Sequence, residues 1–172
     1  MLAVHAQPAR PADRPFALIS ATSGQEGTDQ QFRGTWELVF FGYTYCPDVC
    51  PTTLSNIAEV MSELGSLAPE VHPLFVTVDP ARDTPPVLAA YTAAFDPRIV
   101  GLTGSPEQIA KVAAEFGARY FRREVEGDYF VDHTATIYVV GPDGTVRSTF
   151  LPTDGPDRMT TGLRQLIRSA AG

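Results

Sequence analysis

Two apolar patterns alternate along this chain, and each predicts a different kind of element. Short apolar runs bounded by turn residues are typical of strands, and they occur at 15–21, 36–41, 73–78, 99–102, 119–124, 129–131, 134–140 and 145–150. A turn and a short return strand are expected within 24–30. Apolar residues at helical spacing predict helices over 51–64, 86–95, 106–116 and 159–167.

The helix over 106–116 has the clearest boundary signals. Ser105 is a preferred N-cap, Pro106 suits the first helical position, Gln108 completes a capping box and Gly117 favours the helix end. The helix over 86–95 is expected to form one apolar side from Val87, Leu88, Tyr91 and Phe95.

The order of these elements predicts the fold class. Strands that alternate with helices favour a sheet covered on both faces. A strand–helix–strand unit, followed by a hairpin around 141–144 and a terminal helix, is the thioredoxin-like layout. We therefore expect an α/β, thioredoxin-like fold, with a central mixed sheet covered by helices, an N-terminal β-hairpin and an inserted helix and strand. Glu37 interrupts the apolar strand over 36–41 and is harmless if it points outward at a strand edge.

Length and composition indicate one folded domain. The chain has 172 residues, of which 44% are hydrophobic, and this excludes a largely disordered protein. No apolar run approaches the roughly 18 residues of a membrane-spanning helix. We expect a flexible leader over 1–14 and a single domain over 15–172. The leader lacks the apolar stretch of a signal peptide and would suit a linker that follows an anchor.

The charge argues against nucleic acid as a partner. Thirteen basic and twenty acidic residues give a net charge of −7. Phosphate-binding surfaces need clustered lysine and arginine, and the densest basic spots here are two short pairs, Arg122 with Arg123 and Arg164 with Arg168.

The chemistry of the chain centres on its two cysteines, Cys46 and Cys50. They follow the strand over 36–41 and precede a helix, where the positive helix terminus is expected to make both sulfurs more thiolate-like than a free cysteine. They form a redox pair, a metal site or two neighbouring core thiols. Two thiolates are an incomplete set for structural zinc, whereas Cu(I) accepts soft ligands at low coordination number.

Three histidines are available as a further ligand. His5 lies in the leader, and His72 is expected to be a solvated turn residue before a strand. His133 lies on the loop that enters the strand over 134–140. In a thioredoxin-like layout this loop packs beside the cysteine helix, so His133 is the candidate.

These residues resemble those of the Sco/SenC family of copper-binding proteins, which assist cytochrome c oxidase assembly. The resemblance covers roughly residues 15–168, and its most specific parts are CPDVCP at 46–51 and DHT at 132–134. It extends over FRG at 32–34, FFGYTYCPDVCPTTL at 40–54, VTVDPARDTP at 76–85, IVGLTGSPEQIAKVA at 99–113 and VDHTATIYVVGPDG at 131–144.

The resemblance implies a thioredoxin-like domain that binds one copper, as Cu(I) or Cu(II), through Cys46, Cys50 and His133. The family is thought to deliver copper to, or to reduce the cysteines of, the dinuclear copper centre of oxidase subunit II. Members are usually tethered by an N-terminal helix and face the periplasm or the mitochondrial intermembrane space. One lysine among 13 basic residues fits a bacterial source, hence the periplasmic side of the inner membrane.

Residues that neighbour these ligands in the sequence are expected to have further roles around the copper. Asp48 and Asp132 are expected either to accept hydrogen bonds that orient the ligands or to act only as a solvated residue and a turn cap, respectively. Asp79 and Asp83 are interpreted as turn and helix-capping residues, with docking of a partner as an alternative. The remaining pair, Tyr43 and Tyr45, is expected to line the mouth of the site.

Two functions remain open at this stage. In a metallochaperone, the ion is cargo and His133 is needed. In a thiol–disulfide oxidoreductase, Cys46 and Cys50 cycle between dithiol and disulfide, and His133 is not needed. Another periplasmic copper chaperone or a thioredoxin-like reductant is the expected second partner. A peroxidase is a weaker third hypothesis, because no recognisable set of Thr, Cys and Arg residues that activates peroxide is present.

Overall fold

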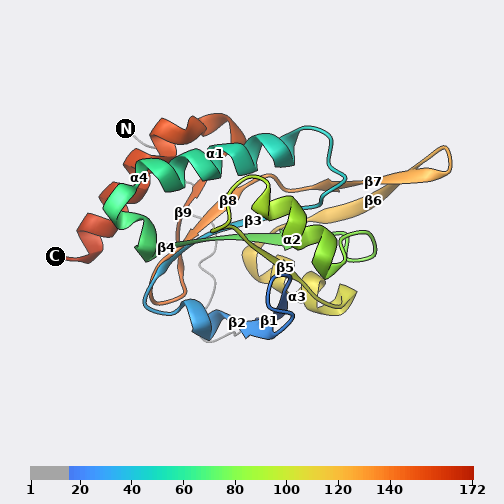
Figure 1. The fold of residues 1–172 in the computed structure, drawn as a ribbon, viewed down its shortest axis with the longest axis horizontal. Coiled ribbons are helices and arrows are strands. Elements are labelled where there is room, and N and C mark those ends of the chain that lie inside the picture. Colours follow the sequence, from blue (N-terminus) through green and yellow to red (C-terminus); the bar gives the residue numbers. More distant parts are fainter. Residues whose placement is uncertain (1–15) are drawn as a thin grey trace.

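A computed structural model describes residues 16–172, which form a seven-stranded mixed sheet with helices on both faces and a separate two-stranded sheet (Figure 1). The leader predicted over 1–14 lies outside the described residues. The strands are β1 (Ala17–Ser20), β2 (Glu26–Thr28), β3 (Trp36–Gly42), β4 (Val71–Thr77), β5 (Val100–Thr103), β6 (Tyr120–Val125), β7 (Asp128–His133), β8 (Ile137–Val140) and β9 (Val146–Phe150). The α-helices are α1 (Val49–Glu63), α2 (Pro85–Ala93), α3 (Pro106–Phe116) and α4 (Gly155–Ala170).

The seven-stranded sheet has the order β2-β1-β5-β4-β3-β8-β9. Its centre is parallel, with β4 paired to both β3 and β5, whereas β8 is antiparallel to β3 and β1 is antiparallel to β5. Every residue of β3 is buried, as expected for a strand covered on both faces. The predicted mixed sheet, its N-terminal β-hairpin and the inserted helix and strand are confirmed.

Successive side chains of β3 point to opposite faces, and this defines the two helical layers. The Phe41 ring contacts Phe116 of α3, with ring centroids 5.6 Å apart. On the other face, Phe40 packs on Phe75, which in turn contacts Tyr91 of α2. Helices α1 and α4 lie together along the upper side of the sheet in Figure 1, and α3 lies below it.

The predicted signals at α3 are confirmed. Ser105 Oγ accepts from the Gln108 backbone N–H at 3.2 Å, and Gln108 Oε1 accepts from the Ser105 N–H at 2.8 Å. Gly117 ends the helix with a φ of 69°, a left-handed conformation that favours glycine.

Two predictions about apolar positions were wrong. Glu37 is not at a sheet edge: it is 1% exposed, because β3 is central and has β4 and β8 on its two sides. Val87 is 46% exposed, whereas its neighbour Leu88 is fully buried. The Leu88 side chain lies against Gly101 of β5, and Val87 faces away from this contact.

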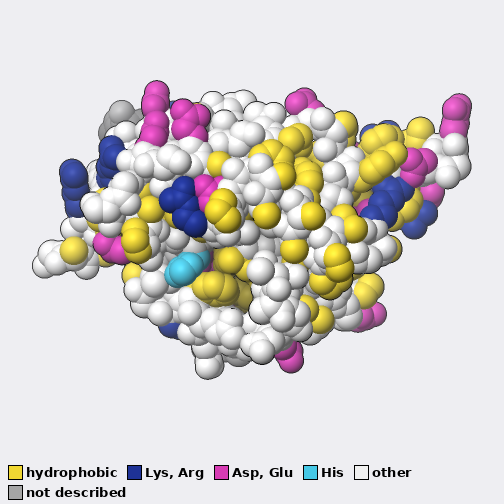
Figure 2. Space-filling view, in the orientation of Figure 1, with side chains coloured by type: hydrophobic (Ala, Val, Ile, Leu, Met, Phe, Trp, Pro, Cys, Tyr) yellow, Lys and Arg dark blue, Asp and Glu magenta, His cyan; other side chains and the backbone are white. Residues whose placement is uncertain are grey.

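A two-stranded ribbon, β6–β7, projects from the body of the protein (Figure 1). Hydrophobic and arginine side chains gather on this projection in Figure 2. His133 is the last residue of β7, rather than part of a loop as predicted, and β8 begins only at Ile137. Cross-strand pairing of His133 with Tyr120 and of Asp132 with Phe121 extends β7 beyond the apolar run.

Helix α1 begins at Val49, two residues before the predicted start. Pro51 is tolerated in the first turn because the N–H groups there have no partner within the helix. Cys50 therefore lies inside the first turn. Within residues 16–172, no helix is both long enough and apolar enough to span a membrane.

Candidate metal centre

Three side chains from distant parts of the sequence meet at the carboxyl end of β3. The Sγ atoms of Cys46 and Cys50 and a ring nitrogen of His133 all lie within 4.8 Å of one another. Cys46 belongs to the loop after β3, Cys50 to the first turn of α1, and His133 to the end of β7. Among residues 16–172, this is the one group of at least three His, Cys, Asp or Glu side chains close enough to share a metal ion.

The two sulfurs differ in depth. Cys46 is 9% exposed and Cys50 is 0% exposed. The deep position of Cys50 depends on Gly42, the last residue of β3: a Cβ atom there would lie 2.6 Å from Cys50 Sγ and 2.7 Å from the Phe75 ring. Sequence analysis did not identify this glycine, because only the folded chain brings its backbone against the sulfur.

The imidazole of His133 is oriented by a backbone group. Its Nδ1 lies 3.1 Å from the Thr134 carbonyl oxygen, and its Nε2 lies 3.4 Å from Cys50 Sγ. A proton on Nδ1 donated to this carbonyl leaves the Nε2 lone pair facing the sulfurs, as a metal ligand requires. Tyr43 and Phe40 place their rings edge-on against the imidazole, with centroids 5.8 and 6.1 Å away.

Hydrogen bonding makes the two thiols unequal. A hydrogen bond from the Cys50 thiol, aided by the backbone N–H groups of Cys50 and Asp48, lowers the pKa of Cys46 to about 4 against the opposing effect of burial. The same bond, together with burial, raises the pKa of Cys50. The prediction that both sulfurs are thiolate-like was therefore wrong for Cys50, because its side chain is the buried donor of the pair.

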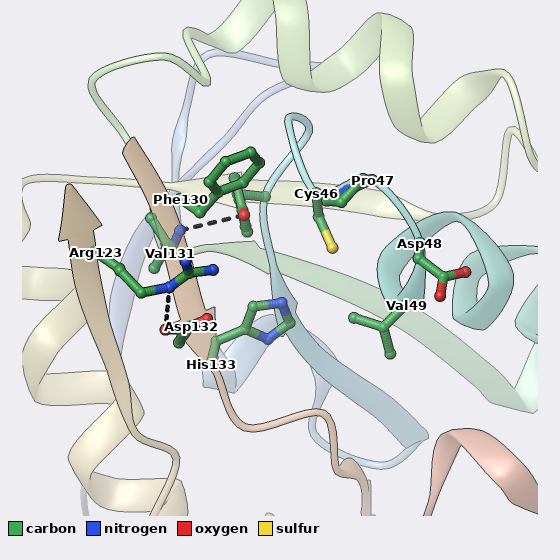
Figure 3. A pocket seen from close by; sticks show the side chains of 10 residues that line it. Cys46, Pro47, Asp48, Val49, Arg123, Phe130, Val131, Asp132 and His133 are labelled. Carbon is green, nitrogen blue, oxygen red and sulfur yellow. Dashed lines mark hydrogen bonds and ion pairs between the residues drawn. The ribbon is translucent and has the colours of Figure 1, made fainter. Parts of the chain in front are cut away.

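A shallow pocket of about 320 Å³ gives access to this cluster. Figure 3 shows Cys46 Sγ and the His133 ring pointing into it, and Val49, at the start of α1, lines it beside them. Tyr43 also lines the pocket but is itself buried. Tyr45 is 51% exposed and packs on the Phe130 ring instead. An incoming group therefore meets Cys46 and His133 before it meets Cys50.

The two aspartates beside the cluster have different surroundings. Asp48 is exposed, makes no side-chain cap at α1, and points away from Cys46 and His133 in Figure 3. Asp132 accepts from Arg123 Nε at 3.0 Å. The hydrogen bond that orients the imidazole comes from Thr134, and a backbone carbonyl carries no signal in the sequence.

Asp83 has a role that the sequence interpretation missed. It is fully buried, and it accepts hydrogen bonds from the Thr44 N–H at 3.1 Å, from Thr44 Oγ1 at 2.5 Å and from Thr77 Oγ1 at 2.6 Å. The N-cap of α2 is Thr84, without a side-chain cap bond, so the predicted capping role of Asp83 was wrong. Asp79 does begin a turn, since its carbonyl accepts from the Arg82 and Asp83 N–H groups.

Among the described residues, the remaining histidine, His72, takes no part in the cluster. His72 is a half-buried residue of β4 that contacts the Phe32 ring, rather than a solvated turn residue, and burial lowers its pKa. His5 lies outside the described residues.

The donor set fits copper. Two thiol sulfurs and an imidazole nitrogen are soft and borderline ligands, and three such donors satisfy Cu(I). Structural zinc usually takes four protein ligands, and residues 16–172 provide three here.

Known proteins are similar to this chain in sequence and in fold. The SCO1/SenC family matches residues 4–168. The human mitochondrial protein SCO1 homolog is 42% identical over 134 residues, which cover 76% of this chain and 44% of the relative. The chain spans about half the length of the curated relatives it matches.

Two solved structures with copper bound have the same fold. Arabidopsis thaliana ScoI superposes with a TM-score of 0.85 at 35% identity, covering 91% of this chain and 98% of that one. Bradyrhizobium japonicum ScoI gives a TM-score of 0.82 at 40% identity, with 88% and 97% covered. Together with the match over residues 4–168, these likenesses show that the chain belongs to the SCO1/SenC family of copper-binding proteins.

Proposed function

We propose that this domain is a copper metallochaperone that binds one copper ion through Cys46 Sγ, Cys50 Sγ and His133 Nε2. The observation that carries the proposal is the convergence of these three donor groups within 4.8 Å, with the Nε2 lone pair turned toward the sulfurs. The two relatives solved with copper bound support it.

In this proposal the copper is cargo, and the protein's residues hold and release it. The two sulfurs suit Cu(I), and the imidazole adds a harder donor that Cu(II) needs more. Of the two neighbouring aspartates, Asp132 is held by Arg123 and Asp48 is turned toward solvent, so neither is proposed as a ligand. The destination is the dinuclear copper (CuA) centre of cytochrome c oxidase, so the partner is oxidase subunit II.

The proposed location follows from this partner. A bacterial oxidase exposes its CuA centre on the periplasmic side of the inner membrane, and we place the domain there, held by an anchor outside the residues described. In a eukaryote the equivalent location is the mitochondrial intermembrane space. A second periplasmic copper chaperone or a thioredoxin-like reductant would supply copper or electrons.

Titration with Cu(I) tests the proposal. Reduced protein is titrated against a competing Cu(I) chelator, beside Cys50→Ala and the control His72→Ala, whose imidazole contacts Phe32 and lies outside the cluster. We expect one tightly bound ion per chain for the native protein and the control, and loss of tight binding for Cys50→Ala. A stoichiometry well above one, or no tight binding, contradicts the proposal.

A second candidate function is reduction of the CuA-site cysteines of subunit II. The unequal thiols favour it: Cys46 is the thiolate nearer the surface, and Cys50 is a buried thiol beside it. Such a pair can attack a disulfide through Cys46 and then close its own bond through Cys50. The two electrons and the new Cys46–Cys50 disulfide then balance the dithiol formed on the substrate.

His133→Ala separates the two functions. We expect this variant to keep the thiol–disulfide couple yet to lose support of oxidase assembly in cells that lack the native protein, at low copper. If it restores oxidase activity as fully as the native protein does, thiol reduction is the main role and the metallochaperone proposal fails.

A further inference from the structure

The cluster is assembled from two halves that come from different parts of the fold. One half is the loop after β3 with the first turn of α1, which carries Cys46 and Cys50. The other is the C-terminal end of β7, the second strand of the projecting ribbon, which carries His133. Because the two halves belong to separate sheets, the distance between sulfur and imidazole depends on whatever holds the ribbon against the body.

One buried side chain, Asp83, is hydrogen-bonded to the loop that carries the cysteine half. Its buried carboxylate accepts from both the N–H and the hydroxyl group of Thr44, two residues before Cys46, and from the hydroxyl group of Thr77 at the end of β4. Three donors converge on this one carboxylate. It therefore ties the cysteine loop to the sheet through a single buried group.

The preceding residue, Arg82, holds the histidine half. Its guanidinium donates to the Tyr129 carbonyl at 2.9 Å and to the Asp128 carboxylate, both at the start of β7, next to the turn of the ribbon. It also lies over the Tyr129 ring, 3.5 Å from the centroid, and over the Tyr45 ring at 4.5 Å. Arg82 thus contacts the ribbon and the cysteine loop at once.

Two further residues contact Tyr129 on the ribbon side of this interaction. The Tyr129 hydroxyl donates to Asp79 Oδ1 at 2.9 Å, and Arg122 covers the opposite face of the same ring at 3.6 Å. The Tyr129 ring is therefore enclosed between two guanidinium groups, only four residues before His133.

We propose that Arg82 and Asp83 are paired positioning residues, in which Asp83 sets the place of the cysteine half and Arg82 sets the place of the histidine half. They are consecutive residues of the β4–α2 loop, so one short segment fixes both halves relative to each other. Asp83 acts through its contacts with Thr44 and Thr77, and Arg82 acts through its contact with Tyr129. Neither residue is itself one of the three proposed copper ligands. The proposal rests on the proposed function for its copper readouts.

Substitutions of Arg82 and of Asp83 should therefore affect different halves of the cluster. Arg82→Gln removes the stacked cation that holds the ribbon, and Arg82→Lys keeps a charge but loses the planar fork. Asp83→Asn replaces one acceptor oxygen with an NH₂ group that faces the donors of Thr44 or Thr77. The first change acts on His133, and the second acts on Cys46 and Cys50.

The copper experiment compares Cu(I) and Cu(II) affinities of reduced protein by chelator competition, together with the nitrogen coupling of bound Cu(II) by pulsed EPR. For Arg82→Gln we expect Cu(II) affinity to fall by about 10- to 100-fold, the imidazole coupling to weaken and Cu(I) affinity to change much less. Arg82→Lys should restore the Cu(II) affinity and the imidazole coupling only in part. Asp83→Asn should weaken both ions together.

Arg98→Gln is the matched control. Arg98 likewise pairs with an aspartate, Asp96, and donates to a backbone carbonyl, that of Met61, but on another side of the fold. The Arg98→Gln variant should keep the native affinities for Cu(I) and Cu(II) and the native nitrogen coupling of bound Cu(II). If Arg82→Gln keeps Cu(II) affinity and the coupling, or loses both ions only in step with its thermal unfolding, the proposal is overturned.

A metal-free measurement distinguishes failure of this inference from failure of the proposed function. The Val131 N–H donates to the Tyr43 hydroxyl at 3.2 Å and so reports directly on docking of the ribbon against the cysteine loop. By hydrogen exchange on apo-protein, Arg82→Gln should release this amide at least about tenfold faster, with the amides of β3 and β4 unchanged. An unchanged Val131 rate overturns the role of Arg82, whether or not copper binds.

Discussion

The cysteine half and the histidine half of the centre are built in different ways. Cys50 is enclosed by Gly42, Phe75 and α1 at the end of a fully buried strand. His133 ends a ribbon whose first strand is largely exposed, and this ribbon joins the body through side-chain contacts instead of pairing with the central sheet. A rigid pair of sulfurs and a more loosely attached imidazole suit an ion that is taken up and released, because one ligand can move while two remain.

The strongest test of this difference is removal of a sulfur. Cys50→Ala leaves one sulfur and one imidazole, so we expect Cu(I) affinity to fall by more than the roughly 10- to 100-fold cost of losing an outer partner. Chelator competition measures it, with His72→Ala as control. A loss no larger than that of His133→Ala would contradict the view that the two sulfurs dominate.

His133→Ala should affect the two oxidation states unequally. Cu(I) can persist on two thiolates, whereas Cu(II) loses its nitrogen donor, so we expect the Cu(II) loss to exceed the Cu(I) loss by about tenfold or more. The same competition assay is run for both ions. Equal losses would mean that the imidazole is as firmly built into the site as the sulfurs.

Gly42→Ala tests the rigidity of the cysteine half. The new methyl group would meet Cys50 Sγ and the Phe75 ring, and overpacking of this kind costs about 1–3 kcal/mol of unfolding free energy. We expect Cu(I) affinity to fall as well, because Cys50 must shift. Denaturant unfolding and chelator competition measure the two effects.

Gly101→Ala is the matched control for this change. Its methyl group would meet Leu88 Cγ at 2.8 Å, on the same sheet but against α2 instead of the sulfurs. Its stability should fall comparably while copper affinity stays. If both variants weaken copper binding to the same extent, the effect of Gly42→Ala reflects general destabilisation.

The unequal thiols predict an unusual pH dependence of alkylation. A Cys46 pKa of about 4 keeps its thiolate present as the pH falls, until the pH approaches that value. The rate of iodoacetamide labelling of apo-protein should therefore change little between about pH 6 and about pH 8, where an ordinary thiol slows about tenfold per unit. Mass spectrometry should locate the label on Cys46; a tenfold fall per unit, or label on Cys50, would contradict the assignment.

The smallest expected effect concerns the surface of the ribbon. Arg123 and Asp132 form an ion pair in which both side chains are substantially exposed. Such pairs contribute about 0–1 kcal/mol, so Arg123→Gln should leave the unfolding free energy nearly unchanged in a denaturant titration. A loss above this range would show that the ribbon is held more firmly by its surface than by Arg82.

The sequence predicted the elements that carry regular signals. The apolar runs located the sheet strands and the capping box located α3. The strand before Cys46 and the helix after it placed the two cysteines at a strand-to-helix turn. Exact boundaries depended on pairing: β7 continues to His133 because Tyr120 lies opposite it. Hydrophobic patterning cannot show such cross-strand partners.

The groups that tune the centre could not be predicted in the same way. Gly42, the Thr134 carbonyl and Asp83 act through close approach, a backbone oxygen and convergent hydrogen bonds, all of which exist only in the folded chain. Glu37 was misjudged because the position of a strand within a sheet is not written in its own residues. The opposite pKa shifts of the two cysteines likewise follow from the hydrogen bond between their side chains, which exists only in the folded chain.

X-ray absorption spectroscopy of the Cu(I)-loaded protein tests the central claim most directly, because it reports which atoms surround the copper. For the native protein at one copper per chain, we predict a shell of two sulfurs and one nitrogen, from Cys46, Cys50 and His133. For His133→Ala we predict the two sulfurs alone. A shell of nitrogen or oxygen without sulfur, or an unchanged shell after His133→Ala, would contradict the account.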